Sequence, residues 1–353
     1  MWREIFTMNF CLLKKTGFFV ATFFLIAEFS SCKKKTDSSK TVQALGTICT
    51  IQLYENASDA LYAELFNRLF QIESEFSVQN PDSELSRVNA ASGKNAVFVG
   101  QDVAFVLQTA LDVAQKSDGA FDPTIGPLVN LWGINTENAH VPAQQEIENA
   151  KSLVNWRNVD FSLTQNGAEV FLQKEGMALD LGGIAKGFAA DELAKILKEK
   201  KVSYALINLG GNVFAFGNKK SNANWKIGIR NPFATQADVA LVLELGGDAS
   251  VVTSGSYERF FEQDGKLYHH ILDPRTGYPC ESGFESVSII LPSSLFADAF
   301  STTAFVLGDS DFWARFDCEA IFIKSDGRVI ASSSLQNKLS VFDPHFSECE
   351  FRN

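Results

Sequence analysis

The spacing of apolar residues along the chain predicts several helices and a larger number of strands. Between Ser58 and Phe76, apolar side chains recur every three or four residues, which indicates an amphipathic helix, and a second helix is expected over 102–115. Short apolar runs with glycine-rich turns dominate the second half, and helices at about 185–198 and 295–307 interrupt them. Strands in runs, with helices between groups of them, favour an α+β fold over a regular parallel α/β sheet.

The first 31 residues have the pattern of a secretion signal. Lys14 and Lys15 precede the apolar stretch TGFFVATFFLIA, which is too short for a permanent membrane span, and small residues then lead to Cys32. The alternative is an ordinary signal peptide followed by an incidental cysteine. We expect a lipoprotein signal peptide over 1–31, lipidation at Cys32, and a solvated tether over 32–44.

Composition and charge narrow the possible partners. The chain has 353 residues, of which 46% are hydrophobic, so it can bury one large core or two closely packed ones. Its formal net charge is −11, and no long basic run follows the N-terminal region, which disfavours a nucleic-acid partner. An acidic protein repels anionic substrates, so a phosphate compound would require a cation or a well-shaped site. The wide spacing of four further cysteines matches no zinc pattern and leaves their disulfide pairing open: Cys49, Cys280, Cys318 and Cys349.

Two glycine-containing stretches have the composition of a phosphate-binding turn. In DLGGIAKGFAADEL (180–193), two glycines end a strand, Lys186 follows, and a helix begins, so free backbone N–H groups lie beside a cation. The position of this lysine rules out a Walker loop, and a helix start packed tightly on a strand is an equally good interpretation. In VVTSGSYER (251–259), small hydroxyl residues flank a glycine, although a simple strand-end turn has the same composition.

A carboxylate and a hydroxyl share one face of a predicted helix in LFADAFSTTAFVLG (295–308). Asp298 and Thr302 are four residues apart, so both oxygens project from the same side. Such a pair suits Mg²⁺, which takes few protein ligands and keeps water or substrate oxygens for the rest. Alternatively, Asp298 serves as a first-turn charge and Thr302 bonds its own helix backbone.

Two of the four histidines stand side by side in YHHILDPRTGYP (268–279). A neutral histidine can accept a proton near neutral pH, and Asp273 follows closely enough to orient one. In an extended segment, His269 and His270 point to opposite faces, so only one can enter a given site. A pair of structural, hydrogen-bonded histidines is the competing interpretation.

Taken together, these segments resemble the ApbE family, the FAD:protein FMN transferases. The resemblance runs in order from LGTICTIQLY at Leu45 to FVLG at Gly308 and includes PDSELSRVN (81–89), SDGAFDPTIGPLVNLWG (117–133), DLGGIAKG (180–187), INLGGNVFAFG (207–217), TSGSYERFF (253–261), YHHILDPRTGYP (268–279) and ADAFSTTAFVLG (297–308). It implies an α+β fold related to the tunnelling fold. We expect one such domain over 45–335 and a C-terminal tail over 336–353.

The resemblance also implies a reaction and roles for individual residues. Enzymes of this family bind FAD and, with Mg²⁺, move its FMN half onto a Thr or Ser hydroxyl of a partner protein, releasing AMP. The family pattern assigns the metal to the Ala185 carbonyl, Asp298 and Thr302, and the base to His270, which Asp273 would assist. Further residues fall in segments that line the flavin nucleotide site: Gln79, Glu84, Asp180, Gly183, Lys186, Thr253, Ser254 and His270.

One position departs from the family pattern. Many members carry an aromatic residue, usually Tyr, where this chain has Gln79. Without that stacking face, hydrolysis of FAD to FMN and AMP is the nearest alternative activity, and a non-catalytic FAD-binding lipoprotein is another. The expected partners are exported or membrane flavoproteins, such as subunits of the sodium-pumping quinone reductase (Nqr) or of Rnf-type complexes. The family's lipoprotein members are consistent with a lipid-anchored protein that faces the periplasm.

Overall fold

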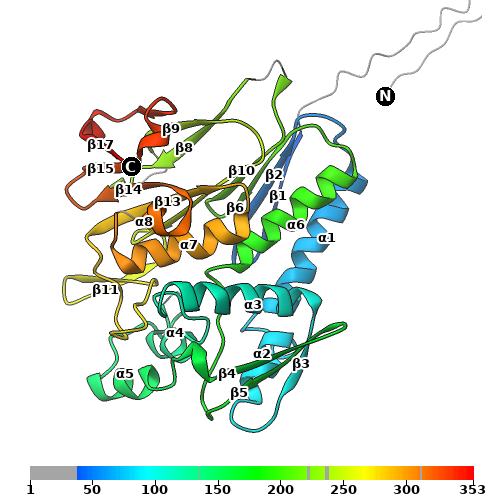
Figure 1. Ribbon diagram of the computed structural model, residues 1–353, viewed down its shortest axis with the longest axis vertical. Helices are drawn as coiled ribbons and strands as arrows, with labels where there is room; N and C mark the ends of the chain where they lie inside the picture. The colour runs from blue at the N-terminus through cyan, green and yellow to red at the C-terminus, as the bar shows by residue number, and fades with distance from the viewer. Residues whose placement is uncertain (1–37, 135, 221–222, 235–237, 311) are drawn as a thin grey trace, which may run out of the picture. The chain divides into compact units, whose positions relative to one another are not determined.

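The structure is a computed structural model that describes residues 38–134, 136–220, 223–234, 238–310 and 312–353. The expected signal peptide and the lipidation site at Cys32 lie outside these residues. Figure 1 shows the arrangement of the helices and strands.

The largest sheet among the described residues has nine strands and forms the centre of the fold. In spatial order it contains β1 (Ser38–Ala44), β2 (Thr47–Leu53), β6 (Ala205–Leu209), β7 (Asn212–Phe216), β10 (Ala249–Gly255), β13 (Phe284–Leu291), β14 (Glu319–Lys324), β15 (Val329–Ser332) and β17 (Cys349–Arg352). Neighbouring strands are antiparallel except β15 and β17, which are parallel. This mixed, mainly antiparallel sheet confirms the expected α+β class.

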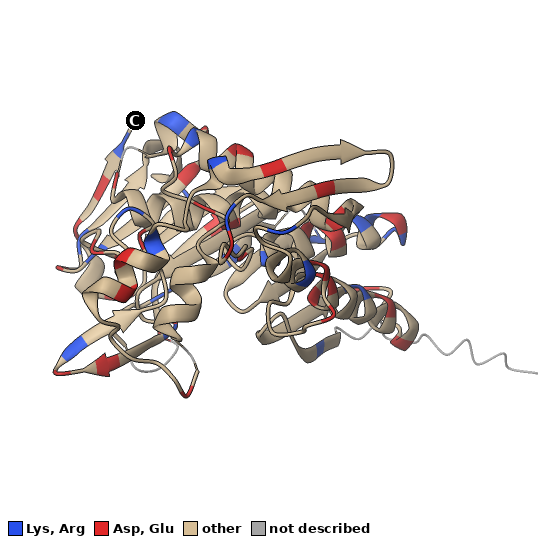
Figure 2. Ribbon diagram, turned by 90° about the horizontal axis from the view of Figure 1, so that it is seen from below, with Lys and Arg blue, Asp and Glu red and all other residues tan. Residues whose placement is uncertain are grey.

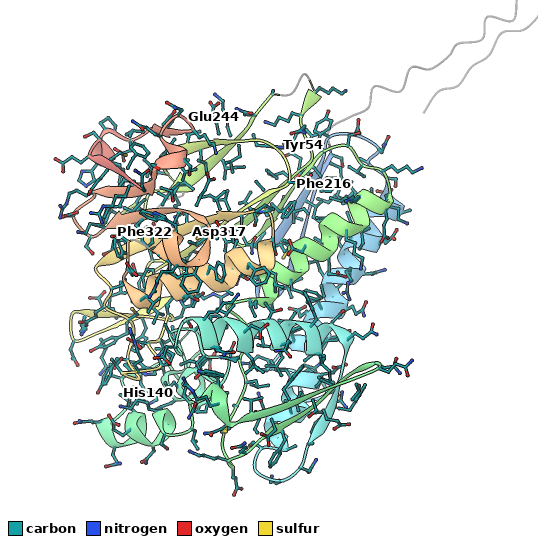
Figure 3. The ribbon with its side chains drawn as sticks, in the orientation of Figure 1. Tyr54, His140, Phe216, Glu244, Asp317 and Phe322 are labelled. Carbon is teal, nitrogen blue, oxygen red and sulfur yellow. The ribbon has the colours of Figure 1, made fainter. Side chains whose placement is uncertain are left out.

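Both faces of the central strands are buried. Successive side chains of a strand point to opposite faces, so Val252 and Ile289 pack toward the helices, whereas Val251 and Ile290 pack on the other side. Phe216 and Phe322, both labelled in Figure 3, belong to the core on the helix side. The opposite face is covered by a three-stranded sheet of β16 (Leu339–Val341), β9 (Val239–Leu245) and β8 (Trp225–Arg230).

Four long helices pack on the other face of the large sheet and contribute to its core: α1 (Asp59–Phe76), α3 (Gln101–Lys116), α6 (Ala185–Glu199) and α7 (Ser294–Leu307). Their apolar spacing explains their position, since Leu61, Leu65, Leu69, Ile72 and Phe76 of α1 are all buried. In Figure 1, α6 and α7 lie in front of the sheet, and α3 crosses below them. The first turn of α6 contacts α7, where Gly187 N–H donates to Asp298.

The remaining elements lie around these layers. They are α2 (Glu84–Ala90), α4 (Gly126–Trp132), α5 (Gln144–Lys151) and α8 (Phe312–Phe316), the sheet of β3 (Val97–Gly100), β5 (Gly167–Leu172) and β4 (Val159–Thr164), and the hairpin of β11 (Phe260–Gln263) and β12 (Lys266–His269). The segment 117–133, whose glycines and prolines indicate a loop, contains α4. This helix has Pro127 in its first turn and ends at Gly133 with φ 58°, which is the usual place for each residue.

Two predicted boundaries differ from the structure. Residues 38–44 of the expected tether form β1, which pairs with β2 at the sheet edge; its polar side chains are those that an exposed edge strand tolerates, so composition alone resembled a linker. The expected tail over 336–353 belongs to the domain, because β16 pairs with β9, β17 pairs with β15, and Phe346 is fully buried. Such pairing between distant segments has no local sequence pattern.

The described surface and cysteines add three observations. Acidic and basic residues are interspersed over the helices and strands in Figure 2. None of the helices in the described ranges has both the length and the apolar character needed to cross a membrane. All four described cysteines are free thiols, so the structure contains no disulfide among them.

Candidate active site

The DLGGIAKG turn is held in place before α6 begins. The backbone N–H of Asp180 donates to the Pro123 carbonyl at 2.8 Å, and the Asp180 carboxylate accepts from Gly182 N–H at 2.7 Å. Lys186, on the first turn of α6, donates from Nζ to the Gly182 carbonyl at 3.1 Å. The lysine is only partly buried, so its ammonium group remains available to an anion beside the turn.

The backbone of the first turn of α6 contacts α7 directly. Gly187 N–H donates to Oδ2 of Asp298 at 2.8 Å, although the two residues are far apart in sequence. A Cβ at Gly187 would lie 2.2 Å from the Ser294 carbonyl oxygen, so only glycine permits this approach. Asp298 is 4% exposed, and this burial raises the pKa of its carboxyl against the opposing effects of Lys186 and the backbone N–H groups.

Two oxygen-bearing side chains of α7 suited to a hard cation, Asp298 and Thr302, lie against the turn and the helix start at 183–187. Thr302 lies beside Gly183, where an added Cβ would be 3.4 Å from its Oγ1, and that hydroxyl is 3.5 Å from Ser254 Oγ. Ala185, the first residue of α6, precedes by two residues Gly187, whose N–H donates the hydrogen bond that Asp298 accepts. No group of three or more His, Cys, Asp or Glu side chains able to hold a metal occurs in the part of the chain that the structure describes. One carboxylate, one hydroxyl and a backbone carbonyl are too few ligands for a metal that is bound entirely by side chains. They fit Mg²⁺, which retains water or substrate oxygens as its other ligands.

His270 directly follows β12, and its ring is held by backbone. Its Nδ1 is 3.2 Å from the Arg259 carbonyl oxygen, so Nδ1 is the donor and Nε2 is left as the acceptor. Burial and the positive charges of Arg259 and Lys186 lower the pKa of His270 to about 3. The imidazole is therefore neutral at ordinary pH and can accept a proton.

The second histidine and Asp273 have structural contacts. His269 is buried, with Nε2 2.9 Å from the Cys280 carbonyl oxygen and its ring edge-on to Phe305 at 5.6 Å. The Asp273 carboxylate accepts from the backbone N–H, Nε and Nη2 of Arg275 at 2.8–2.9 Å. The expectation that Asp273 orients His270 is therefore wrong: its oxygens bind the arginine of the following turn, and a backbone carbonyl holds the histidine.

The other candidate residues divide into two groups. Ser254 joins the α7 contact, because its Oγ is 2.9 Å from Ser301 Oγ. Thr253 instead pairs with Ser288 of the neighbouring strand at 2.7 Å. Glu84 accepts from Gly100 N–H at 2.6 Å at the start of α3, and Gln79 is exposed. No hydrogen bond or ion pair between described residues links Gln79, Glu84 or Thr253 to Lys186 or His270.

The site contains one cation that was not among the predicted residues. Arg259 contributes its carbonyl to His270, and its charge acts on both His270 and Asp180. It lies within the stretch TSGSYERFF. Its role follows from the hairpin register, in which Phe260 faces His269 and places Arg259 opposite His270, and no local pattern encodes that register.

Residues 45–322 match the ApbE family. The chain belongs to this family. An FAD:protein FMN transferase of Treponema pallidum is 37% identical, with 95% of this chain and 98% of the relative covered, and one of Klebsiella pneumoniae is 38% identical, with 85% and 93% covered. Among solved structures, the ApbE protein of Thermotoga maritima superposes with a TM-score of 0.78 at 32% identity, covering 86% of this chain and 99% of its own. The flavin transferase ApbE of Vibrio cholerae gives a TM-score of 0.75 at 26% identity, covering 86% and 100%.

Proposed function

We propose that this ApbE-family protein transfers the FMN half of FAD to a Thr or Ser hydroxyl of a target flavoprotein, with Mg²⁺, and releases AMP. The relatives named FAD:protein FMN transferase support flavin transfer. The observation that carries the assignment is the placement of His270: the Arg259 carbonyl, 3.2 Å from Nδ1, leaves Nε2 as the acceptor, and the charges of Lys186 and Arg259 act on the same ring. This combination of a proton acceptor and two cations suits the attack of a hydroxyl on a diphosphate.

The protein's own residues account for the proton and for part of the charge. His270 Nε2 accepts the proton of the acceptor hydroxyl as its oxygen forms a bond to the FMN phosphorus. The bond from that phosphorus to the bridging oxygen breaks, and AMP leaves with that oxygen. Lys186 and Arg259 offset the negative charge of the phosphates. The fixed turn at 180–187 positions Lys186, and the β11–β12 hairpin positions Arg259.

The residues at the contact of α6 and α7 fit a magnesium ion. The Ala185 carbonyl, the Asp298 carboxylate and the Thr302 hydroxyl would hold it. When bound, Mg²⁺ withdraws charge from a diphosphate and from its leaving group. The burial of Asp298 favours such a ligand role, because a buried carboxylate is stabilised by a paired cation.

Hydrolysis of FAD is the second candidate, and the exposed, non-aromatic Gln79 favours it. The two activities differ in a chromatographic assay of the purified protein with FAD and MgCl₂, with and without an acceptor domain. A transferase releases AMP in proportion to flavin bound to the acceptor and leaves FAD largely intact without acceptor. Accumulation of free FMN and AMP without acceptor would identify a hydrolase, and FAD that stays intact in every condition would leave only a binding role. Gln79→Tyr tests the stacking argument, since a tighter Kd for FAD is expected.

The cellular setting is also a proposal. The sequence pattern before Cys32 supports a lipid anchor there, with the domain facing the periplasm. The acceptors would then be exported or membrane flavoproteins, including Nqr- and Rnf-type subunits. Cys32→Ala should move the protein from the membrane fraction to the soluble fraction of lysed cells. Retention of this variant in the membrane fraction would contradict the anchor.

A further inference from the structure

The first turns of α6 and α7 are each capped by a carboxylate from the other helix. Ile184 precedes α6 without a side-chain cap, and Asp298 of α7 accepts from Gly187 N–H at 2.8 Å. In return, Asp191 of α6 accepts from Ser293 Oγ at 2.9 Å, from Ser294 N–H at 2.8 Å and from Leu295 N–H at 3.0 Å at the start of α7. Free N–H groups of a helix start and an acidic partner attract each other strongly, so this reciprocal arrangement ties the two helices together.

The same turn of α7 is also fixed to the large sheet. Ser294 donates from Oγ to Asn212 Oδ1 of β7 at 2.8 Å and accepts from Ser250 Oγ of β10 at 2.8 Å. Its carbonyl is the atom that an added Cβ at Gly187 would meet. A shift of this turn therefore moves the contact between the helices and everything carried on α7.

We infer that Asp191 is a positioning residue that sets α7 along α6, so that Asp298 and Thr302 face Ala185. Asp298 follows Ser294 by four residues, roughly 6 Å along a rigid helix, so displacement of the first turn displaces the carboxylate too. The inference rests on the proposed magnesium site for its functional consequence. The effect of Asp191 on the Gly187 hydrogen bond, transmitted through α7, does not depend on the metal.

A matched pair of variants separates positioning from charge and from general destabilisation. Asp191→Asn keeps the size of the side chain but removes an acceptor and turns an amide N–H toward α7. Glu192→Gln makes the same charge change at the next residue of α6, where Glu192 pairs with Arg68 of α1 at 2.7 Å rather than with α7. Ser293→Ala keeps the Asp191 carboxylate and its two backbone hydrogen bonds, and serves should Asp191→Asn fold poorly. It deletes the Ser293 hydrogen bond to Asp191 together with the cap that Ser293 Oγ provides to Phe296 N–H.

Two readouts on the purified protein test the inference. Hydrogen exchange reports the amides of Gly187, Ser294 and Leu295, and electron paramagnetic resonance reports the Kd for Mn²⁺ added alone as a probe. Asp191→Asn should speed exchange at all three amides. It should weaken Mn²⁺ binding about tenfold, the lower end of the effect of losing a partner bonded directly to a ligand, because Asp191 acts on the ligands only through the first turn of α7. Ser293→Ala should change both in the same direction but less, and Glu192→Gln should leave both near wild type.

The outcomes separate this inference from the proposed function. Unchanged exchange at Gly187 in Asp191→Asn would overturn the positioning role, as would equal weakening of Mn²⁺ binding by Glu192→Gln. A wild-type protein that binds no Mn²⁺, but whose Gly187 exchange responds to Asp191→Asn, would overturn the proposed metal site and support the coupling between the helices.

Discussion

Gly187→Ala tests the close approach of α6 and α7. The new Cβ would lie 2.2 Å from the Ser294 carbonyl oxygen, 2.7 Å from its carbon and 2.8 Å from Asp298 Cβ, whereas ordinary contacts begin at 3.4 Å. The first two atoms are backbone and cannot rotate away, so the helices must separate by about 1 Å. Overpacking of this kind costs about 1–3 kcal/mol of unfolding free energy, and the better helix propensity of alanine returns about 1 kcal/mol.

The net loss of stability should therefore be small, while the loss of activity should be large. A displacement of about 1 Å in a catalytic arrangement can cost on the order of 100-fold in rate. The midpoint temperature of thermal unfolding should fall by a few degrees. The initial rate of AMP release from FAD in the presence of the acceptor should fall about 100-fold. Gly246→Ala is the matched control, because no atom lies within 4 Å of its added Cβ. Wild-type activity in Gly187→Ala would refute the argument that this contact positions Asp298.

Four further predictions concern His270, Asp273 and the metal. His270→Gln should lower kcat by about 10²–10⁴-fold and leave the Kd for FAD nearly unchanged; similar kcat would exclude His270 as the base. Because the pKa of His270 is lowered to about 3 from 6.5, the unfolded chain binds its proton first as the pH falls. The His270 contribution to the free energy of unfolding is therefore complete above pH 6.5 and declines as the pH falls from 6.5 toward 3. For the same reason, the fall of kcat/KM on the acid side should lie below pH 5. A midpoint of that fall near pH 6.5 would contradict the lowered pKa. Asp273→Asn should lower the unfolding temperature through loss of the Arg275 contacts without shifting the pH profile, and a shifted profile would restore a direct role toward His270. EDTA should abolish AMP release and excess Mg²⁺ should restore it, whereas EDTA-resistant turnover would exclude the metal.

The helical parts of the site were the most predictable from sequence. Periodic apolar residues predicted α1, and an apolar segment predicted α7. The four-residue spacing of Asp298 and Thr302 placed them on one face of α7. The glycines and Lys186 of DLGGIAKG correctly indicated a turn that leads into a helix. The strand expected before this turn is absent from the described residues 173–184, because β5 ends at Leu172 and only Ala178 makes an isolated bridge, to Ile125. These features depend on local geometry, which a single sequence encodes.

The parts that could not be predicted depend on contacts between distant segments. Asp273 follows His270 by three residues, yet its carboxylate turns to Arg275, which offers two side-chain donors and a backbone N–H. The role of Arg259 depends on hairpin register, and that of Asp191 on the crossing of α6 and α7. Likewise, β1 and the C-terminal strands are stabilised by partners that their own composition does not indicate.

The most direct test of the account is the intact mass of an acceptor flavoprotein domain after incubation with this protein, FAD and Mg²⁺. The account predicts a gain of one FMN phosphoester on the acceptor, with AMP released in equal amount. The gain should disappear when the acceptor Thr or Ser is replaced by Ala, and when His270→Ala replaces the wild-type enzyme. An acceptor of unchanged mass, together with free FMN and AMP in solution, would contradict the transferase assignment.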